Sequence, residues 1–423
     1  MADFSQQLAI LRSKMAAIDS KYAPAAALPA IPRLTTAQRH FADDLISGSV
    51  IETPVGKHFE TEKLWERHRR HGSVGIADLE HLPEDLLDSL SDGAIPRSHP
   101  SKWCFLDTET TGLSGGTGTY AFLIGCGSIE RDGFRVRQFF MRDYGEEASQ
   151  LHALAEYLER FDVLITYNGK TFDQPLLETR YRMVRRRHPF ARMEHLDLLF
   201  GARRLWKIRL ESCRLVHLEN QILGVEREGD LPGELIPYYY FDYVRTQKAV
   251  KLIPILHHNV VDIVSLACLT AIVPEAFRSP STVPVRHGAD LLGVARWLLH
   301  AERAPEALAM LRRALQLGLP DAHLFRTMLD IGVLEKKLGN EAASVAMFTD
   351  LAASPNGFQV RAFEELAKFY EHRERNYAMA LEMTRHAQTI GGGPEIDRRV
   401  ERLRTRLAKK APKKRARAAR LPL

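Results

Sequence analysis

Cysteine is scarce in this 423-residue sequence, which contains only Cys104, Cys126, Cys213 and Cys268. None of them is spaced as C-x-x-C, so the sequence indicates neither a structural zinc site nor a redox motif. Three of the four lie inside apolar runs and are expected to be small core residues. Because so few thiols, without any pairing pattern, are typical of a reducing compartment, we expect a cytoplasmic protein.

Long hydrophobic runs are also missing. No stretch reaches about 18 consecutive apolar residues, so the sequence predicts no membrane-spanning helix and no membrane partner. The N-terminal segment carries charges throughout and lacks the apolar centre of a secretory signal. Apolar residues make up 45% of the chain and charged residues 26%, which is an ordinary mixture for a globular protein.

Acidic residues are absent between Lys409 and Arg420, a segment that holds seven of the lysines and arginines. Without these seven, the formal net charge of the chain falls from +6 to −1. The basic character therefore belongs to a terminal arm, and residues 408–423 are predicted to be a basic disordered tail. Such an arm either binds polyanions without sequence preference or only keeps the protein soluble.

Pattern and composition divide the chain into four regions. Residues 1–95 are mixed and carry no assignable chemistry. Residues 96–278 are predicted to form an α/β domain, and residues 286–407 an all-α repeat domain that precedes the tail from residue 408.

The α/β region begins with WCFLDTET, an apolar strand that ends in acids. Two further strand patterns follow, joined by the turn residues RDG. Helical and strand patterns then alternate. The expected strands are 103–110, 119–130, 134–143, 163–168 and 195–199, and the expected helices are 146–161, 173–188, 213–223 and 260–272. This order matches a ribonuclease-H-like mixed sheet flanked by helices.

Apolar positions in the helical region recur with offsets of 37 and 36 residues. This spacing is close to the tetratricopeptide period of about 34. We therefore expect tetratricopeptide-like repeats, through which a protein partner can bind. A plain helical bundle is the alternative.

Asp107 and Glu109 are two residues apart at the end of the first strand. Side chains at i and i+2 of a strand face the same way, so both carboxylates point to one side. Two adjacent acids repel each other, and a divalent cation with its preference for oxygen ligands removes that cost. The alternative is a solvated strand end.

The second element is YNGKTFD, which lies between a strand and a helix. Asp173 falls near the helix N-terminus, where a carboxylate also acts as a cap. Asn168 fits a turn, and Phe172 is expected to anchor the loop in the core.

The third element is HHNVVDIVSL, residues 257–266. His258 and Asp262 are four residues apart, so on a helix they share a face. Asp262 then supplies a further carboxylate, and a histidine acts as general base near neutral pH. An exposed polar pair is the alternative.

The three elements together resemble the DEDD (DnaQ-like) superfamily of 3′–5′ exonucleases. Within it, the sequence is most similar to the bacterial YprB-like ribonuclease-H-like family, whose members can carry C-terminal tetratricopeptide repeats. The resemblance covers about residues 100–275. It implies hydrolysis of phosphodiester bonds in DNA or RNA with two Mg²⁺ or Mn²⁺ ions. The implied metal ligands are Asp107, Glu109, Asp173 and Asp262.

The general base is left open by the third element. His257 has the five-residue spacing to the last acid that some members of the superfamily use, and His258 occupies the position of a tyrosine in others. We favour His258, because its i,i+4 relation to Asp262 directs both groups into one cleft. Thr110, Tyr167 and Asn168, beside the motif acids, are candidate substrate-binding residues.

Two other functions fit the same sequence. One is an endonuclease or resolvase on the same fold. The other is a non-catalytic nucleic-acid-binding or scaffold protein. Retention of four mutually repelling carboxylates favours an enzyme, because a binding module has no need of them.

Overall fold

The structure is a computed structural model that describes residues 46–410, except 92, 113–116, 228 and 282–284. The chain divides into two compact units, Met1–Val283 and Pro284–Leu423. Of the expected basic tail, residues 408–410 belong to the last helix, α16 (Pro394–Lys410), and residues 411–423 lie outside the described part.

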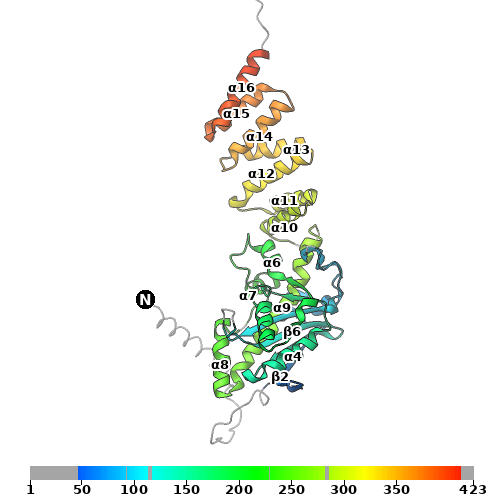
Figure 1. The fold of residues 1–423 in the computed structure, drawn as a ribbon. Coiled ribbons are helices and arrows are strands. Elements are labelled where there is room, and N and C mark those ends of the chain that lie inside the picture. The colour runs from blue at the N-terminus through cyan, green and yellow to red at the C-terminus, as the bar shows by residue number, and fades with distance from the viewer. Residues whose placement is uncertain (1–45, 92, 113–116, 228, 282–284, 411–423) are drawn as a thin grey trace, which may run out of the picture. The chain divides into compact units, whose positions relative to one another are not determined.

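The first unit is built on a seven-stranded sheet with the strand order β1-β2-β7-β6-β5-β8-β9 (Figure 1). Strands β5, β8 and β9 are parallel to one another, and the remaining pairs are antiparallel. A separate two-stranded ribbon joins β3 (Arg70–His71) to β4 (Val74–Gly75). The strands of the main sheet are β1 (Ser49–Thr53), β2 (Gly56–Glu66), β5 (Trp103–Thr110), β6 (Ala121–Glu130), β7 (Gly133–Phe140), β8 (Val163–Thr166) and β9 (Glu194–Asp197).

Strands β1 and β2 precede residue 96, so the sheet begins before the expected start of the α/β domain. Polar residues hide the pattern of β2 in the sequence. Glu60 lies 2.5 Å from Arg137 and Glu62 lies 2.5 Å from Arg135 on the neighbouring strand β7. These cross-strand ion pairs take the place of the apolar alternation that marks a strand.

Helices cover both faces of the sheet, which confirms the expected fold class. On one face, α4 (Glu147–Leu158) and α5 (Asp173–Met183) pack onto the apolar residues of β5, β6 and β7. On the other face, α9 (Leu252–Arg278) contacts the same three strands. The remaining α-helices in the described part of this unit are α3 (Asp88–Ser91), α6 (Leu198–Trp206), α7 (Leu215–Leu218) and α8 (Ile236–Thr246).

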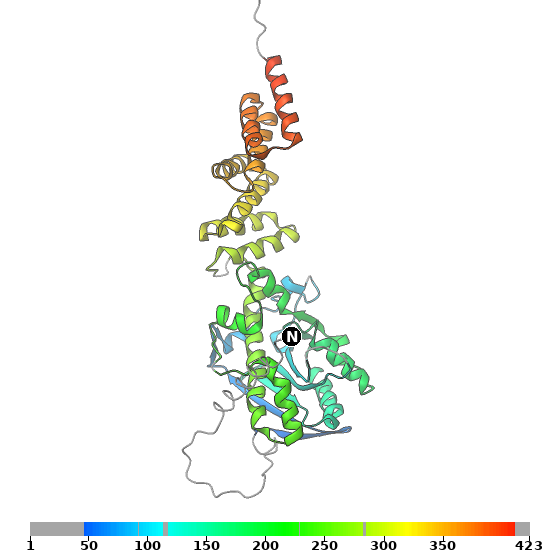
Figure 2. The same ribbon diagram turned by 90° about the vertical axis from the view of Figure 1, so that its left-hand side faces the viewer.

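The long helix α9 is the central core element of the first unit (Figure 2). With its preceding turn, Ala249–Arg278 is apolar and long enough to cross a membrane, but 78% of its most apolar window is buried inside the structure. Its close approach to the sheet depends on glycine in β6. A Cβ atom at Gly125 would lie 2.2 Å from the Asn259 side-chain oxygen and 2.3 Å from a methyl carbon of Ile263.

The second unit is entirely helical in its described part, with each helix packed against the next. Helices α11, α13 and α15 begin 37 and 36 residues apart, as the sequence offsets do. That the repeats are of the tetratricopeptide type stays a prediction. The helices are α10 (Gly288–His300), α11 (Ala304–Leu317), α12 (Asp321–Lys337), α13 (Glu341–Ala352), α14 (Gln359–His372), α15 (Tyr377–Gly391) and α16.

We expect Gly125→Ala to lower the free energy of unfolding by about 1–3 kcal/mol, because the added methyl group overlaps the side chains of α9. Gly233→Ala is the matched control, since a Cβ atom there has nothing within 4 Å. Urea denaturation followed by tryptophan fluorescence measures both variants. Equal unfolding midpoints would contradict the close packing of α9 on β6.

Candidate active site

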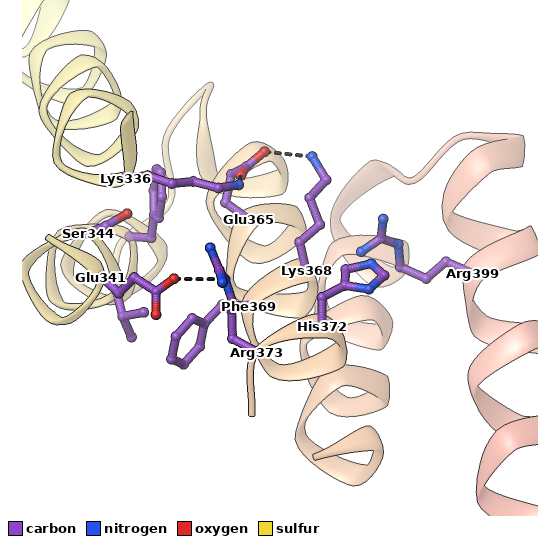
Figure 3. A pocket seen from close by; sticks show the side chains of 11 residues that line it. Lys336, Glu341, Ser344, Glu365, Lys368, Phe369, His372, Arg373 and Arg399 are labelled. Carbon is purple, nitrogen blue, oxygen red and sulfur yellow. Dashed lines mark hydrogen bonds and ion pairs between the residues drawn. The ribbon is translucent and has the colours of Figure 1, made fainter. Parts of the chain in front are cut away.

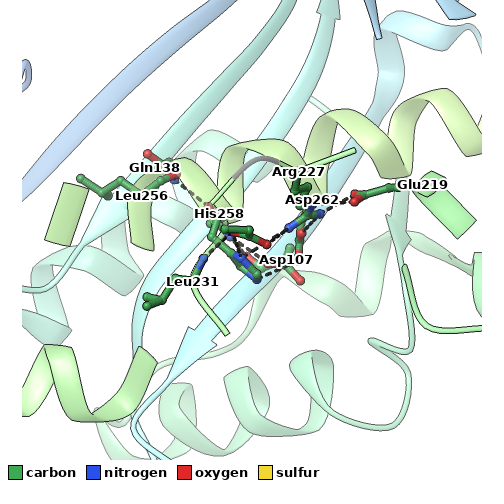
Figure 4. A network of polar contacts seen from close by, with 10 residues as sticks. Asp107, Gln138, Glu219, Arg227, Leu231, Leu256, His258 and Asp262 are labelled. Carbon is green, nitrogen blue, oxygen red and sulfur yellow. Dashed lines mark hydrogen bonds and ion pairs between the residues drawn. The ribbon is translucent and has the colours of Figure 1, made fainter. Parts of the chain in front are cut away.

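Strand β5 carries Asp107 and Glu109 to the edge of the sheet where the parallel strands β5, β8 and β9 all have their carboxyl ends. Helix α9 fixes the first of these acids. The Asn259 side-chain amide donates a hydrogen bond of 2.8 Å to the Asp107 carboxylate. The amide is oriented in turn by buried Gln138 of β7, whose Nε2 donates to the Asn259 oxygen over 2.8 Å (Figure 4).

Asp173 is the first residue of α5 and lies beside the end of β5. The Thr108 hydroxyl donates a hydrogen bond of 2.5 Å to its Oδ1. Burial raises the pKa of Asp173 to about 6, against the lowering effect of the Thr108 hydrogen bond. The expectation that Phe172 anchors this loop in the core is wrong, because its side chain is 54% exposed. The loop is held instead by Asp197, which accepts hydrogen bonds from the backbone N–H groups of Asn168 and Lys170 at 2.8 and 3.1 Å.

The four motif carboxylates act on one another electrostatically. Burial, and then the charges of Asp262 and Asp173, raise the pKa of Asp107 well above its usual value. Burial, and then the charges of Asp107, Asp262 and Asp173, raise the pKa of Glu109 in the same way. The structure therefore brings all four acids within electrostatic reach of one another, although they come from three separate parts of the chain.

Asp262, on α9, is held by two basic groups. The Arg227 guanidinium forms an ion pair with its Oδ1, and His258 Nε2 lies 3.7 Å from its Oδ2. Nδ1 of the same histidine lies 2.8 Å from a carboxylate oxygen of Asp230. Burial disfavours the charged ring, but the hydrogen bond to Asp230 and the charge of Asp262 outweigh it, so the pKa of His258 is raised.

His257 and His258 differ in their surroundings. His258 is 9% exposed and lies between Asp230 and Asp262. His257 is exposed on the neighbouring position of α9. Of the two histidines, His258 is therefore the one that contacts the acids of the site.

Arg227 is a site residue that sequence reasoning missed. It lies in the loop between α7 and α8, and it contacts three carboxylates, those of Glu219, Asp230 and Asp262 (Figure 4). Glu219 is fully buried, so the guanidinium is required to neutralise it. The only signal in the sequence was the Gly- and Pro-containing loop around Asp230, and loop position alone does not indicate charge pairing.

The three candidate substrate residues lie at the ends of two different strands. Thr110 ends β5, and its hydroxyl donates to the Gly112 carbonyl over 2.8 Å. Tyr167 and Asn168 follow β8 and line a cavity of about 450 Å³ with residues of α6 and α7. Tyr167 donates to the Cys213 carbonyl over 2.5 Å, and Asn168 has a left-handed backbone with φ of 69°.

The donor set suits a hard divalent cation, because every motif ligand offers carboxylate oxygens. The crowding of acids around Glu109 points the same way, since after burial the largest influences on its pKa are four other carboxylates. As the side chains are placed, no three His, Cys, Asp or Glu residues in the described part are arranged to hold an ion. Three of the acids bind protein partners instead. Asp107 accepts a hydrogen bond from Asn259, Asp173 accepts one from Thr108, and Asp262 accepts one from Arg227.

We expect Arg227→Met to lower the free energy of unfolding by about 3–5 kcal/mol, because Glu219 then stays buried without its partner. Arg245→Met is the control, since that side chain is 79% exposed and pairs with a surface carboxylate, a contact worth at most about 1 kcal/mol. Denaturant unfolding in chelator measures both. Equal stability of the two variants would contradict the role of Arg227 as the neutralising cation.

The chain resembles a known protein over most of its length. Residues 104–273 match the RNase_H superfamily. The chain is 33% identical over 350 residues to the uncharacterized protein YprB of Bacillus subtilis (strain 168), and the matched region spans 80% of this chain and 82% of that protein. A solved family B DNA polymerase from the hyperthermophilic archaeon Pyrobaculum calidifontis is similar with a TM-score of 0.33 and 11% identity, over 58% of this chain and 34% of that chain. On the strength of the matched superfamily and the extended identity to YprB, the chain belongs to the YprB-like family of ribonuclease-H-superfamily proteins.

Proposed function

We propose that this protein is a metal-dependent nuclease, a 3′–5′ exonuclease that hydrolyses phosphodiester bonds of DNA or RNA. The observation that supports it is the gathering of Asp107, Glu109, Asp173 and Asp262 at one sheet edge, where burial, and then the charges of the neighbouring acids, raise the pKa of Asp107 and of Glu109. A stable fold gains nothing from such repulsion. Perturbed carboxylates of this kind mark functional sites.

The same four carboxylates would hold two Mg²⁺ or Mn²⁺ ions. Such ions supply charge neutralisation at a scissile phosphate and acidify an attacking water. The protein residues keep the carboxylates in place for this purpose. Asn259 orients Asp107, and Thr108 orients Asp173. Binding at Asp262 has to compete with Arg227 for the same carboxylate.

His258 is proposed as the general base. When Nδ1 keeps its proton and donates a hydrogen bond to Asp230, the neutral ring carries its lone pair on Nε2, the atom that faces Asp262. Asp230 is thus a positioning residue that selects the ring tautomer, as carboxylate partners of catalytic histidines do. A water near Asp262 can then transfer its proton to Nε2.

Phe172 is proposed to contact the substrate. Its ring is 54% exposed although it directly precedes Asp173. An exposed aromatic ring beside acids that receive a nucleic-acid strand is suited to stacking on an unpaired base. Tyr167 and Asn168 flank the same loop and remain proposed substrate contacts, as does Thr110.

An endonuclease is the competing activity on this fold. A covalently closed circular substrate separates the two, because an exonuclease leaves it intact. A non-catalytic binding protein is distinguished by comparing product formation in metal and in chelator. Such a protein binds the strand but forms no cleavage products in either condition.

We also propose that the second unit binds a protein partner. Helices α12, α13, α14 and α16 enclose a cavity of about 340 Å³ (Figure 3). Phe348 and Phe369 supply apolar surface. Lys336 and Lys368 both pair with Glu365, and Arg373 pairs with Glu341. With Arg399, four cations against these two carboxylates leave the lining positively charged. Such a groove fits an acidic peptide. Arg385→Glu, on α15, is the control for Lys368→Glu. Equal affinity of an acidic peptide for these two variants would contradict the proposed role.

We expect Asp107→Asn to lower the rate of hydrolysis by at least about 10²–10³-fold, because the substitution removes a carboxylate on which charge stabilisation depends. In chelator the variant should melt at or above the wild-type temperature, since one repelling charge is gone. Asp162→Asn, at an exposed position before β8, is the matched control. The assay uses 5′-labelled single-stranded DNA and RNA with Mg²⁺, Mn²⁺ or chelator. Undiminished hydrolysis by a folded Asp107→Asn protein would falsify the proposal.

His258→Ala should reduce turnover by about 10²–10⁴-fold, the usual contribution of a general base. His257→Ala should leave turnover close to that of the wild type, because His257 is exposed and outside the Asp230–Asp262 contact. Single-turnover kinetics on the same labelled strands measure both. Equal losses in the two variants would remove the distinction between them.

A further inference from the structure

A basic pocket lies at the carboxyl end of β8, and its basic side chains have no role in the hydrolysis proposed above. It is the cavity of about 450 Å³ that Tyr167 and Asn168 line from the end of β8. Its basic side chains are Arg203 on α6, Lys207 directly after α6, and Arg214 directly before α7. We define the basic pocket by these five residues.

Positive charge predominates in the basic pocket. Arg203, Lys207 and Arg214 are all exposed, and Glu211 is the single acid among the lining residues. Lys207 Nζ donates to the Glu211 backbone carbonyl over 3.2 Å. Within the described residues, neither Arg203 nor Arg214 forms an ion pair. Two cations without a carboxylate partner, facing one cavity, are suited to an anion.

The wall of the pocket is firmly held. Asp197, only 4% exposed, accepts hydrogen bonds from the backbone N–H groups of Asn168, Lys170 and Leu199. Tyr167 is fixed by its hydrogen bond to the Cys213 carbonyl. The pocket therefore has a defined shape before any ligand arrives, which reduces the entropic cost of binding.

The sheet places this pocket close to the carboxylates. Strands β5 and β8 pair in parallel with Phe105 opposite Ile165. Asp107 lies two residues beyond this pair on β5, and Tyr167 directly follows the end of β8 at Thr166. The carboxylates and the pocket are therefore both found at the carboxyl ends of two adjacent parallel strands, and the pocket continues to α6.

We propose that the basic pocket binds a phosphate group of the nucleic-acid strand, adjacent in the chain to the phosphate that lies at the carboxylates. This inference rests on the proposed function, because it assumes a strand at the carboxylates. Arg203 and Arg214 contact the phosphate oxygens, as arginine does with phosphates in general. The pocket positions the strand without reading its bases.

The test measures binding separately from hydrolysis. Fluorescent single-stranded DNA and RNA are titrated with the Asp107→Asn protein, with and without Arg203→Gln. Arg204→Gln is the matched control, because Arg204 is the next residue of the same helix, is also exposed, and does not line the pocket. We expect Arg203→Gln to weaken binding about two- to fivefold. The slope of log K against the logarithm of the salt concentration should become smaller in magnitude by about 0.7. We expect Arg204→Gln to change neither.

Two further measurements separate the possible outcomes. In the metal-loaded wild-type background, Arg203→Gln should raise KM and leave kcat nearly unchanged. Inorganic phosphate, titrated calorimetrically into the Asp107→Asn protein and its Arg203→Gln form, distinguishes a free phosphate ion from a strand phosphate. Phosphate binding that needs Arg203, together with strand binding that does not, would overturn the proposal.

Failure of this inference is distinguishable from failure of the proposed function. Strand binding that is identical in the Arg203→Gln and Arg204→Gln proteins overturns the pocket assignment, even when the wild type hydrolyses nucleic acid. If the wild type hydrolyses neither DNA nor RNA but its strand affinity still depends on Arg203, the proposed hydrolysis is lost and the pocket assignment stands.

Discussion

Repulsion between carboxylates at the edge of the sheet is the constraint on which the site depends. Asp107 and Glu109 are both shifted toward their protonated forms by burial and by neighbouring acids. Three carboxylates in the site are held by specific partners: Asp107 by Asn259, Asp173 by Thr108 and Asp262 by Arg227. The packing that brings these partners into place is therefore also what keeps the acids together.

Helix α9 connects the repelling carboxylates to the hydrophobic core. It carries both Asn259 and Asp262, and it reaches the sheet only because β6 has a glycine opposite Asn259. Its long apolar face is buried against the sheet. Burial of that face stabilises the fold, and the same contact holds two polar residues against a charged strand end. The favourable free energy of burying this face thus offsets the repulsion between the carboxylates, as stable cores do for functional sites in many proteins.

The sequence predicted the elements with strong local patterns. The apolar strand that carries Asp107, the hairpin at residues 131–133 and the i,i+4 pair of His258 and Asp262 each have a local pattern that is visible without tertiary structure. Strand β2 was missed because its acids are neutralised by arginines of β7, a compensation that depends on pairing. Arg227 and Asp230 were missed for the same reason, since only folding brings their loop to α9. Phe172 was misplaced because hydrophobicity alone does not distinguish a core ring from an exposed one.

The four motif carboxylates are proposed to form a site for divalent cations. X-ray diffraction from crystals grown in Mn²⁺, recorded for anomalous scattering, tests for such a site. We expect anomalous peaks in contact with the carboxylates of Asp107 and Asp262, with the ion pair between Arg227 and Asp262 broken or lengthened. Crystals in saturating Mn²⁺ that show no anomalous peak among the four carboxylates, and an intact pair between Arg227 and Asp262, would contradict it.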